Sequence, residues 1–184
     1  MGYFLLVLGI GLFAGGHWIK RLAPDARAAW GDKGKRILSL IMVLGVVAMV
    51  IGYRNAGFVN VWVPPAFMTH IANLLVLIGF WFFALGNING TMAARVRHKQ
   101  LTGVKAWAVA HLLVNGDLAS IILFGGMLAW AVVSVILINR ANRAWDRPTD
   151  VSVLKDAIAF GVGAVLYGVV AFFHTWLGYY PFPM

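Results

Sequence analysis

Three histidines of this chain, His70, His111 and His174, are predicted to lie at one depth in a membrane. Each falls about one helical turn inside one end of a long apolar segment, and at about 1.5 Å per residue all three come within roughly 5–6 Å of the same boundary. Ionisable side chains in a membrane are unfavourable and usually face the interior of a helix bundle. Neutral imidazole binds haem iron, copper and zinc, so this layer is a candidate ligand or proton-handling site. The alternative is that each imidazole only makes a hydrogen bond between helices.

His111 precedes a turn of three residues, Asn115–Asp117, which alone separates its apolar segment from the next one. Both dipeptides in this turn, Asn-Gly and Gly-Asp, are typical of turns. Trp107, His111 and Asn115 follow i, i+4 spacing and share one face of a helix. Asp117 can cap the following helix by accepting a hydrogen bond from its first turn. Alternatively, its carboxylate can orient the imidazole of His111, with Asn115 at the same level.

The other two histidines, His17 and His98, lie beside basic residues at the opposite edge, where we expect loop or phospholipid contacts. The chain has no cysteine, which excludes disulfides, thiolate-bound metal and covalently attached haem. It also has no glutamate, so paired-carboxylate chemistry would depend on the six aspartates. Imidazole is therefore the main group that could bind a metal here.

Membrane-spanning helices are the elements that must position these residues. The sequence is 61% hydrophobic and 11% charged, which is too apolar for a soluble domain of this size. Crossing the hydrocarbon takes about 20 apolar residues, with a range of roughly 17–25. Segments of this kind occupy residues 2–19, 37–53, 67–86, 118–138 and 157–177, and a shorter one runs from about residue 99 to 114. We therefore expect an all-α polytopic membrane protein, a six-helix transmembrane bundle that forms a single domain over residues 1–184.

Lysine and arginine alternate between the two sides of this predicted bundle. Thirteen of the 15 lie in the connections after the first, third and fifth segments, and Arg54 is the one in the alternate connections. Lys105 lies near the basic end of the fourth segment and can reach the headgroups. Since positive charge marks the cytoplasmic side, both termini are expected to be periplasmic in a bacterial inner membrane. The net charge of +9 thus reflects orientation and contact with the lipid bilayer, and does not indicate nucleic-acid binding.

Small and aromatic residues suggest where helices touch and where the outer interface lies. The Gly11-x-x-x-Gly15 motif in the first segment predicts close packing of that helix. Tyr179 and Phe182 follow the last segment, and we expect them to form part of an interfacial tail.

The segment from Arg97 to Ser120 resembles the core of the NnrU family, a set of bacterial integral membrane proteins linked to nitrite and nitric oxide reduction. The likeness is most specific over Trp107–Ser120. Lys99 departs from the pattern, which has proline after the arginine–histidine pair. The other matching features, spread over nearly the whole chain, are His17, Pro64-Pro65 followed by His70, and His174-x-Trp176-Leu177-Gly178.

The NnrU family is in turn similar to the plant and cyanobacterial zeta-carotene isomerase, a membrane protein that uses haem b for a redox-dependent cis–trans isomerisation. The resemblance implies that histidines of this chain bind haem b, with His111 as an axial ligand. It offers His17 as the second ligand, whereas the comparison of depths favours His70 or His174.

Three functions remain open at this point. The first is a haem-b-binding membrane protein with a redox or isomerase-type role, tied to nitric oxide metabolism and denitrification. The second is a non-catalytic accessory protein that matures or stabilises a nitrogen-oxide reductase, in which the histidines pack or dock. The third is a small transporter, although no inverted repeat or broken helix favours it. The absorption spectrum of the purified protein separates the first from the other two.

Overall fold

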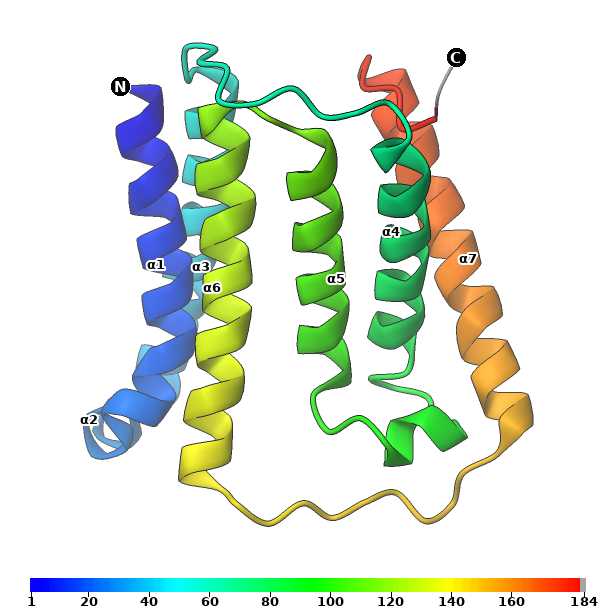
Figure 1. The fold of residues 1–184 in the computed structure, drawn as a ribbon. Helices are drawn as coiled ribbons and strands as arrows, with labels where there is room; N and C mark the ends of the chain where they lie inside the picture. The colour runs from blue at the N-terminus through cyan, green and yellow to red at the C-terminus, as the bar shows by residue number, and fades with distance from the viewer. Residues whose placement is uncertain (183–184) are drawn as a thin grey trace. The chain divides into compact units, whose positions relative to one another are not determined.

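The structure is a computed structural model that describes residues 1–182 of the chain. Its helices are α1 (Gly2–Leu22), α2 (Pro24–Ala29), α3 (Gly31–Arg54), α4 (Met68–Ala84), the 3₁₀ helix η1 (Thr91–Ala94), α5 (Lys99–Val114), α6 (Leu118–Ala141) and α7 (Val153–Trp176) (Figure 1). Over these residues the β pairing is limited to two isolated bridges, Asn60–Asp117 and Gly90–Ser152. The predicted all-α fold is confirmed.

Six of these helices lie where the sequence predicts membrane spans. α1, α3, α6 and α7 have 21–24 residues and are long and apolar enough to cross a membrane. α4 is apolar but has 17 residues, and α5 has 16. At about 1.5 Å per residue these two are roughly 25 Å long, a little under the hydrocarbon thickness of about 30 Å. The helices thus fit a membrane-embedded protein, whereas the six-span count and the periplasmic termini stay predictions.

The short helix α2 lies in a connection that hydropathy treats as a loop. It begins with Pro24. An N–H at the first position of a helix has no partner within the helix, so proline loses no hydrogen bond there, and its φ is already helical. Asp25 in the first turn and Arg27 in the last both interact favourably with the helix dipole. A helix of six residues is too short to be recognised from hydrophobic periodicity.

The described residues form two compact units, and each unit combines separate stretches of the chain. The first, residues 1–63 and 116–143, contains α1, α2, α3 and α6. The second, residues 64–115 and 144–182, contains α4, η1, α5 and α7. Within the units, α1 contacts α3 and α6, and α4 contacts α5 and α7 (Figure 1). All three histidines of the predicted layer lie in the second unit.

In the first unit, α1 and α3 approach each other at glycines. A Cβ atom on Gly9 would lie 2.6 Å from the carbonyl oxygen of Gly45, and one on Gly45 would lie 2.9 Å from that of Gly9. Gly52, seven residues further along α3, faces the backbone of α1 as closely. By contrast, a Cβ atom on Gly11 or Gly15 would meet nothing within 4 Å. The prediction that α1 packs closely through Gly11 and Gly15 is therefore wrong, and the close approach is at Gly9.

The second unit uses glycines in the same way. A Cβ atom on Gly103 of α5 would lie 2.5 Å from the carbonyl oxygen of Gly79 on α4. One on Gly163 of α7 would lie 2.8 Å from the backbone nitrogen of Trp81, also on α4. Because both neighbours approach the α4 backbone itself, a larger residue at these positions would force the helices apart.

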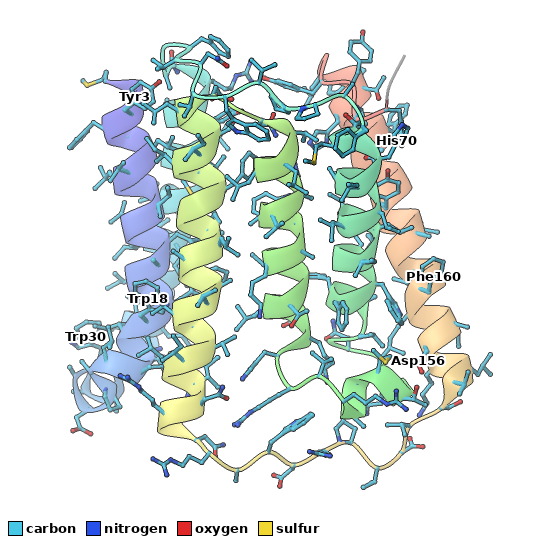
Figure 2. All side chains as sticks on the ribbon, in the orientation of Figure 1. Tyr3, Trp18, Trp30, His70, Asp156 and Phe160 are labelled. Carbon is cyan, nitrogen blue, oxygen red and sulfur yellow. The ribbon has the colours of Figure 1, made fainter. Side chains whose placement is uncertain are left out.

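Asp156, in the first turn of α7, fixes the loop that follows α4 (Figure 2). Its carboxylate accepts hydrogen bonds from the backbone N–H groups of Thr91 at 2.8 Å and Met92 at 3.2 Å, and from the Thr91 hydroxyl. Gly90 leaves room for it, because a Cβ atom there would overlap the carboxylate. Asp156 thus caps η1 from another helix.

Candidate functional site

The imidazoles of His111 and His174 are held in the same way. Nδ1 of His111, on α5, lies 2.9 Å from the carbonyl oxygen of Trp107, and Nδ1 of His174, on α7, lies 2.8 Å from that of Val170. A carbonyl oxygen only accepts hydrogen bonds, so Nδ1 carries the proton in both rings. In a neutral imidazole the lone pair is then on Nε2, the nitrogen that can bind a metal or accept a proton.

These two histidines lie in the second unit, on helices that both contact α4. Both side chains are half-buried. The ring of Trp107 packs 5.1 Å from that of His111. Of the predicted histidine layer, His111 and His174 are therefore the two whose imidazoles are held by hydrogen bonds, and their role as ligands stays a prediction.

His70, the third member of the layer, lies in the first turn of α4 with an exposed side chain (Figure 2). Its backbone N–H donates to the carbonyl oxygen of Phe67 at 3.1 Å. Within residues 1–182 its imidazole makes neither a hydrogen bond nor a ring contact. His70 is therefore less constrained than the other two, and its role as a ligand stays a prediction.

His17 lies on α1, in the first unit, and its ring is held as in the other two histidines. Its Nδ1 lies 2.8 Å from the carbonyl oxygen of Phe13. The ring centroid is 4.4 Å from that of Phe13 and 5.0 Å from that of Trp130. Trp130 is 8% exposed, and its indole N–H has no hydrogen-bond partner in the described part of the chain. Thus the lone pair of His17 also falls on Nε2, and its role as a haem ligand stays a prediction from the family resemblance.

Asp117 caps α6, as the sequence predicts. One carboxylate oxygen accepts from the backbone N–H of Ser120 at 2.9 Å, and the other accepts from its hydroxyl at 2.6 Å. The side-chain amide of Asn115 donates to the backbone carbonyl of His111 at 2.8 Å, so this contact closes the end of α5. The orientation of the His111 imidazole by Asp117 stays a prediction.

Tyr53, on α3, extends this cap into a chain of three side chains that sequence reasoning missed. Its hydroxyl oxygen lies 2.8 Å from Oγ of Ser120. Because Ser120 donates its proton to the carboxylate of Asp117, which can only accept, Tyr53 must donate to Ser120. No feature of the spacing connects residue 53 with residue 120.

Sequence reasoning also missed Asn73, the one amide side chain in α4. Its Oδ1 accepts a hydrogen bond from the Tyr167 hydroxyl on α7 at 3.1 Å, and its Nδ2 donates to the carbonyl oxygen of Pro181 at 2.8 Å. A polar side chain inside an apolar span was the signal that could have identified it. Asn73 joins α4, α7 and the residues after α7.

A haem needs fewer protein ligands than a metal ion that the protein binds alone. Within residues 1–182 no group of three or more His, Cys, Asp or Glu residues could hold a metal ion. The haem macrocycle binds iron itself, so the protein has only to supply axial ligands. A hydrogen bond from the second ring nitrogen to a carbonyl, as in His111 and His174, is typical of metal-binding histidines.

Comparison with known proteins identifies a family. The model of the family described as NnrU protein matches residues 5–181. No curated protein and no solved structure matches the chain.

Proposed function

The chain belongs to the NnrU family, and we propose that it is a haem-b-binding protein of the bacterial inner membrane with a redox or isomerase-type role. The resemblance described above is the basis for the haem and for a link to nitrite and nitric oxide metabolism. The long apolar helices α1, α3, α6 and α7 support residence in a membrane. The charge pattern supports an orientation with both termini in the periplasm.

The observation that carries the haem proposal is the shared orientation of His111 and His174. Both rings donate from Nδ1 to a carbonyl of their own helix, so both present the lone pair of Nε2. They belong to one unit, on helices that both contact α4. We therefore propose that these two imidazoles would hold the haem, with His70 and His17 as the alternative partners of His111.

The chain's own groups would tune such a site. The carbonyl oxygens of Trp107 and Val170 hold the two imidazoles in one tautomer and orientation and increase the basicity of Nε2. The half-buried position of both rings limits the approach of water, which is one determinant of haem potential. The bound haem would supply one-electron chemistry at its iron.

The test is the absorption spectrum of detergent-purified protein after expression with excess haem. We expect a haem spectrum whose bands shift, or disappear, in His111→Ala and in His174→Ala. His98→Ala is the matched control, because His98 flanks the opposite end of α5 from His111 and should leave the spectrum unchanged.

Each other outcome of this experiment has a defined meaning. If the protein holds no haem, the proposal fails and the accessory function becomes the better explanation. If His17→Ala removes the haem while His70→Ala and His174→Ala do not, the partner expected from the family resemblance is right. The assignment of His174 would then be wrong.

A further inference from the structure

Basic side chains collect at the end of the second unit where α5 and α7 begin. Two of the three carboxylates in the same stretches are already engaged, since Asp150 pairs with Lys155 at 2.8 Å and Asp156 caps η1. This end of the unit therefore carries more positive charge than its own carboxylates neutralise. Its basic residues are Arg95, Arg97, Lys99, Lys105, Arg147 and Lys155.

A hydrogen bond brings the connection before α7 against the connection before α5. The guanidinium of Arg97 donates to the backbone carbonyl oxygen of Ala144 at 2.8 Å. An extended chain covers at most about 3.3–3.6 Å per residue, so the Cα atom of Arg147 lies within roughly 11 Å of that of Ala144. By the same limit, the Cα atom of Lys99 lies within roughly 7 Å of that of Arg97. The cations of the two connections therefore lie at one end of the unit.

Two of these cations, Lys99 and Lys105, are half-buried and unpaired. Within residues 1–182 their side chains make neither a hydrogen bond nor an ion pair. Lys105 lies six residues after Lys99 in α5, roughly 9 Å further along the helix axis at about 1.5 Å per residue. Because Cα–Cβ bonds tilt towards the N-terminus of a helix, the long side chain of Lys105 can reach back towards the level of Lys99. An ammonium group inside a span is unfavourable without a counter-charge.

Arg147 is held by a neighbouring aromatic ring. Its guanidinium carbon lies 4.9 Å from the centroid of the Trp145 ring. In the described part of the chain, Arg147 has no ion pair. A guanidinium that stacks on a ring can still direct its N–H groups to a phosphate, which it binds with two parallel hydrogen bonds. Trp145 is half-buried, and tryptophan is enriched at membrane interfaces.

Exposed apolar side chains adjoin the basic residues. Val153 and Leu154, the first residues of α7, are 74% and 69% exposed. The bridge between Gly90 and Ser152 attaches this start of α7 to the loop before α5, as do the hydrogen bonds of Asp156 (Figure 2). Cations beside apolar side chains match the two parts of a phospholipid, its phosphate and its acyl chains. A free phosphate or a nucleic acid would use only the cations.

We propose that Lys99, Lys105 and Arg147 form a binding site for the phosphate of an anionic phospholipid, whose acyl chains lie against Val153 and Leu154. The lipid supplies the counter-charge that the two lysines lack. Orientation of the chain in a membrane requires only the total charge of each connection, whereas this site requires these particular side chains. It involves none of the histidines, so it goes beyond the proposed haem function and does not depend on it.

Thermal unfolding of detergent-purified protein with added lipid tests the site. The probe is dioleoyl phosphatidylglycerol, and the control is dioleoyl phosphatidylcholine, which has the same acyl chains and no net charge. We expect phosphatidylglycerol alone to raise the unfolding temperature, because a ligand that binds only the folded state stabilises it. Inorganic phosphate at the same concentration should not. Equal stabilisation by the two lipids, or by phosphatidylglycerol and inorganic phosphate, would overturn the proposal.

Single charge removals distinguish a site from general attraction. Lys105→Gln and Lys99→Gln each remove one charge from the site. Lys33→Gln is the matched control, since it removes one charge from an exposed residue of the first unit on the same predicted side of the membrane. The phosphatidylglycerol concentration that gives half of the stabilisation should rise several-fold in the first two variants and stay unchanged in the control.

The conservative variant Lys105→Arg keeps the charge and should retain most of the response to phosphatidylglycerol. If Lys105→Gln fails to fold, Lys99→Gln and Arg147→Gln carry the same test nearer the helix end. An equal loss of response in Lys33→Gln and in the site variants would overturn the proposal in favour of general attraction. A protein that holds no haem but shows the expected lipid response retains this site and loses the proposed function. A haem-loaded protein that does not distinguish the two lipids retains the proposed function and loses this site.

Discussion

The hydroxyl oxygen of Ser120 lies 2.6 Å from a carboxylate oxygen of Asp117, and the Ser120 side chain is fully buried. The same carboxylate accepts from the backbone N–H of Ser120. Removal of the carboxylate would leave two donors without an acceptor in a region where unsatisfied polar groups are unfavourable. Tyr53, which donates to Ser120, depends on this arrangement as well.

We therefore expect Asp117→Ala to lower the free energy of unfolding by roughly 1–3 kcal/mol, through loss of the helix cap and of the partner of a buried hydroxyl. Unfolding of the detergent-purified protein measures this. Asp146→Ala, at an exposed position in a connection, is the control and should be neutral. If Asp117→Ala is as stable as the control yet loses the haem spectrum or activity, then Asp117 does more than cap α6.

Gly9 and Gly11 offer a matched pair on one helix. Gly9→Ala should destabilise the protein by roughly 1–3 kcal/mol, because its methyl group would meet the carbonyl oxygen of Gly45. Gly11→Ala should be neutral or slightly stabilising, since that methyl group meets open space and alanine favours helix. Thermal unfolding of the two variants checks this, and equal stabilities would contradict the glycine contact between α1 and α3.

Acid should weaken one exposed ion pair with little effect on the whole protein. A hydrogen bond from Lys155, at 2.8 Å, lowers the pKa of Asp150. A lowered folded-state pKa means that the pair contributes stability above the ordinary pKa of aspartate and loses it as the pH falls through the folded value. Because solvent screens this exposed pair, Asp150→Asn should leave the unfolding temperature nearly unchanged at pH 7. In acid, the unfolding temperature of this variant should fall slightly less than that of the unchanged protein. A large loss of stability of Asp150→Asn at pH 7 would contradict the small contribution expected from this ion pair.

The membrane orientation can be read with reporter fusions. Fusions at Asp32, Lys99 and Asn142 should all report the cytoplasm if thirteen of the 15 basic residues mark that side. A periplasmic signal at any of the three positions would contradict the six-span arrangement.

The sequence predicts the helices well and their ends less well. Hydropathy locates α1, α4, α5 and α6 to within a few residues, because apolar length is a direct requirement of the hydrocarbon. α3 begins at Gly31, six residues before the predicted span, since its first turns carry charged residues that hydropathy excludes. α7 likewise begins at Val153, where Ser152 caps it.

The candidate site was predictable only in part. The depth of His111, His70 and His174 follows from counting along their helices, but depth did not decide between His70 and His174 as the partner of His111. The partners of Asn73 and Tyr53 come from residues far away in the sequence, and depth alone does not select among them. The division into two units, each built from two separate stretches of the chain, was not predictable either. The choice of which helices pack together depends on side-chain fit, including single glycines such as Gly79.

The hydrogen bonds of Asn73 have a consequence for biosynthesis. Its hydroxyl partner, Tyr167, follows it by 94 residues, and its carbonyl partner, Pro181, by 108. At about 5–20 residues per second, the ribosome reaches Tyr167 roughly 5–20 s after Asn73 is made. During that interval the amide is inside or near the bilayer without these partners, so its hydrogen-bonding groups are not satisfied by the rest of the chain. A chain that stops before Tyr167 would leave the Asn73 amide without either of these partners.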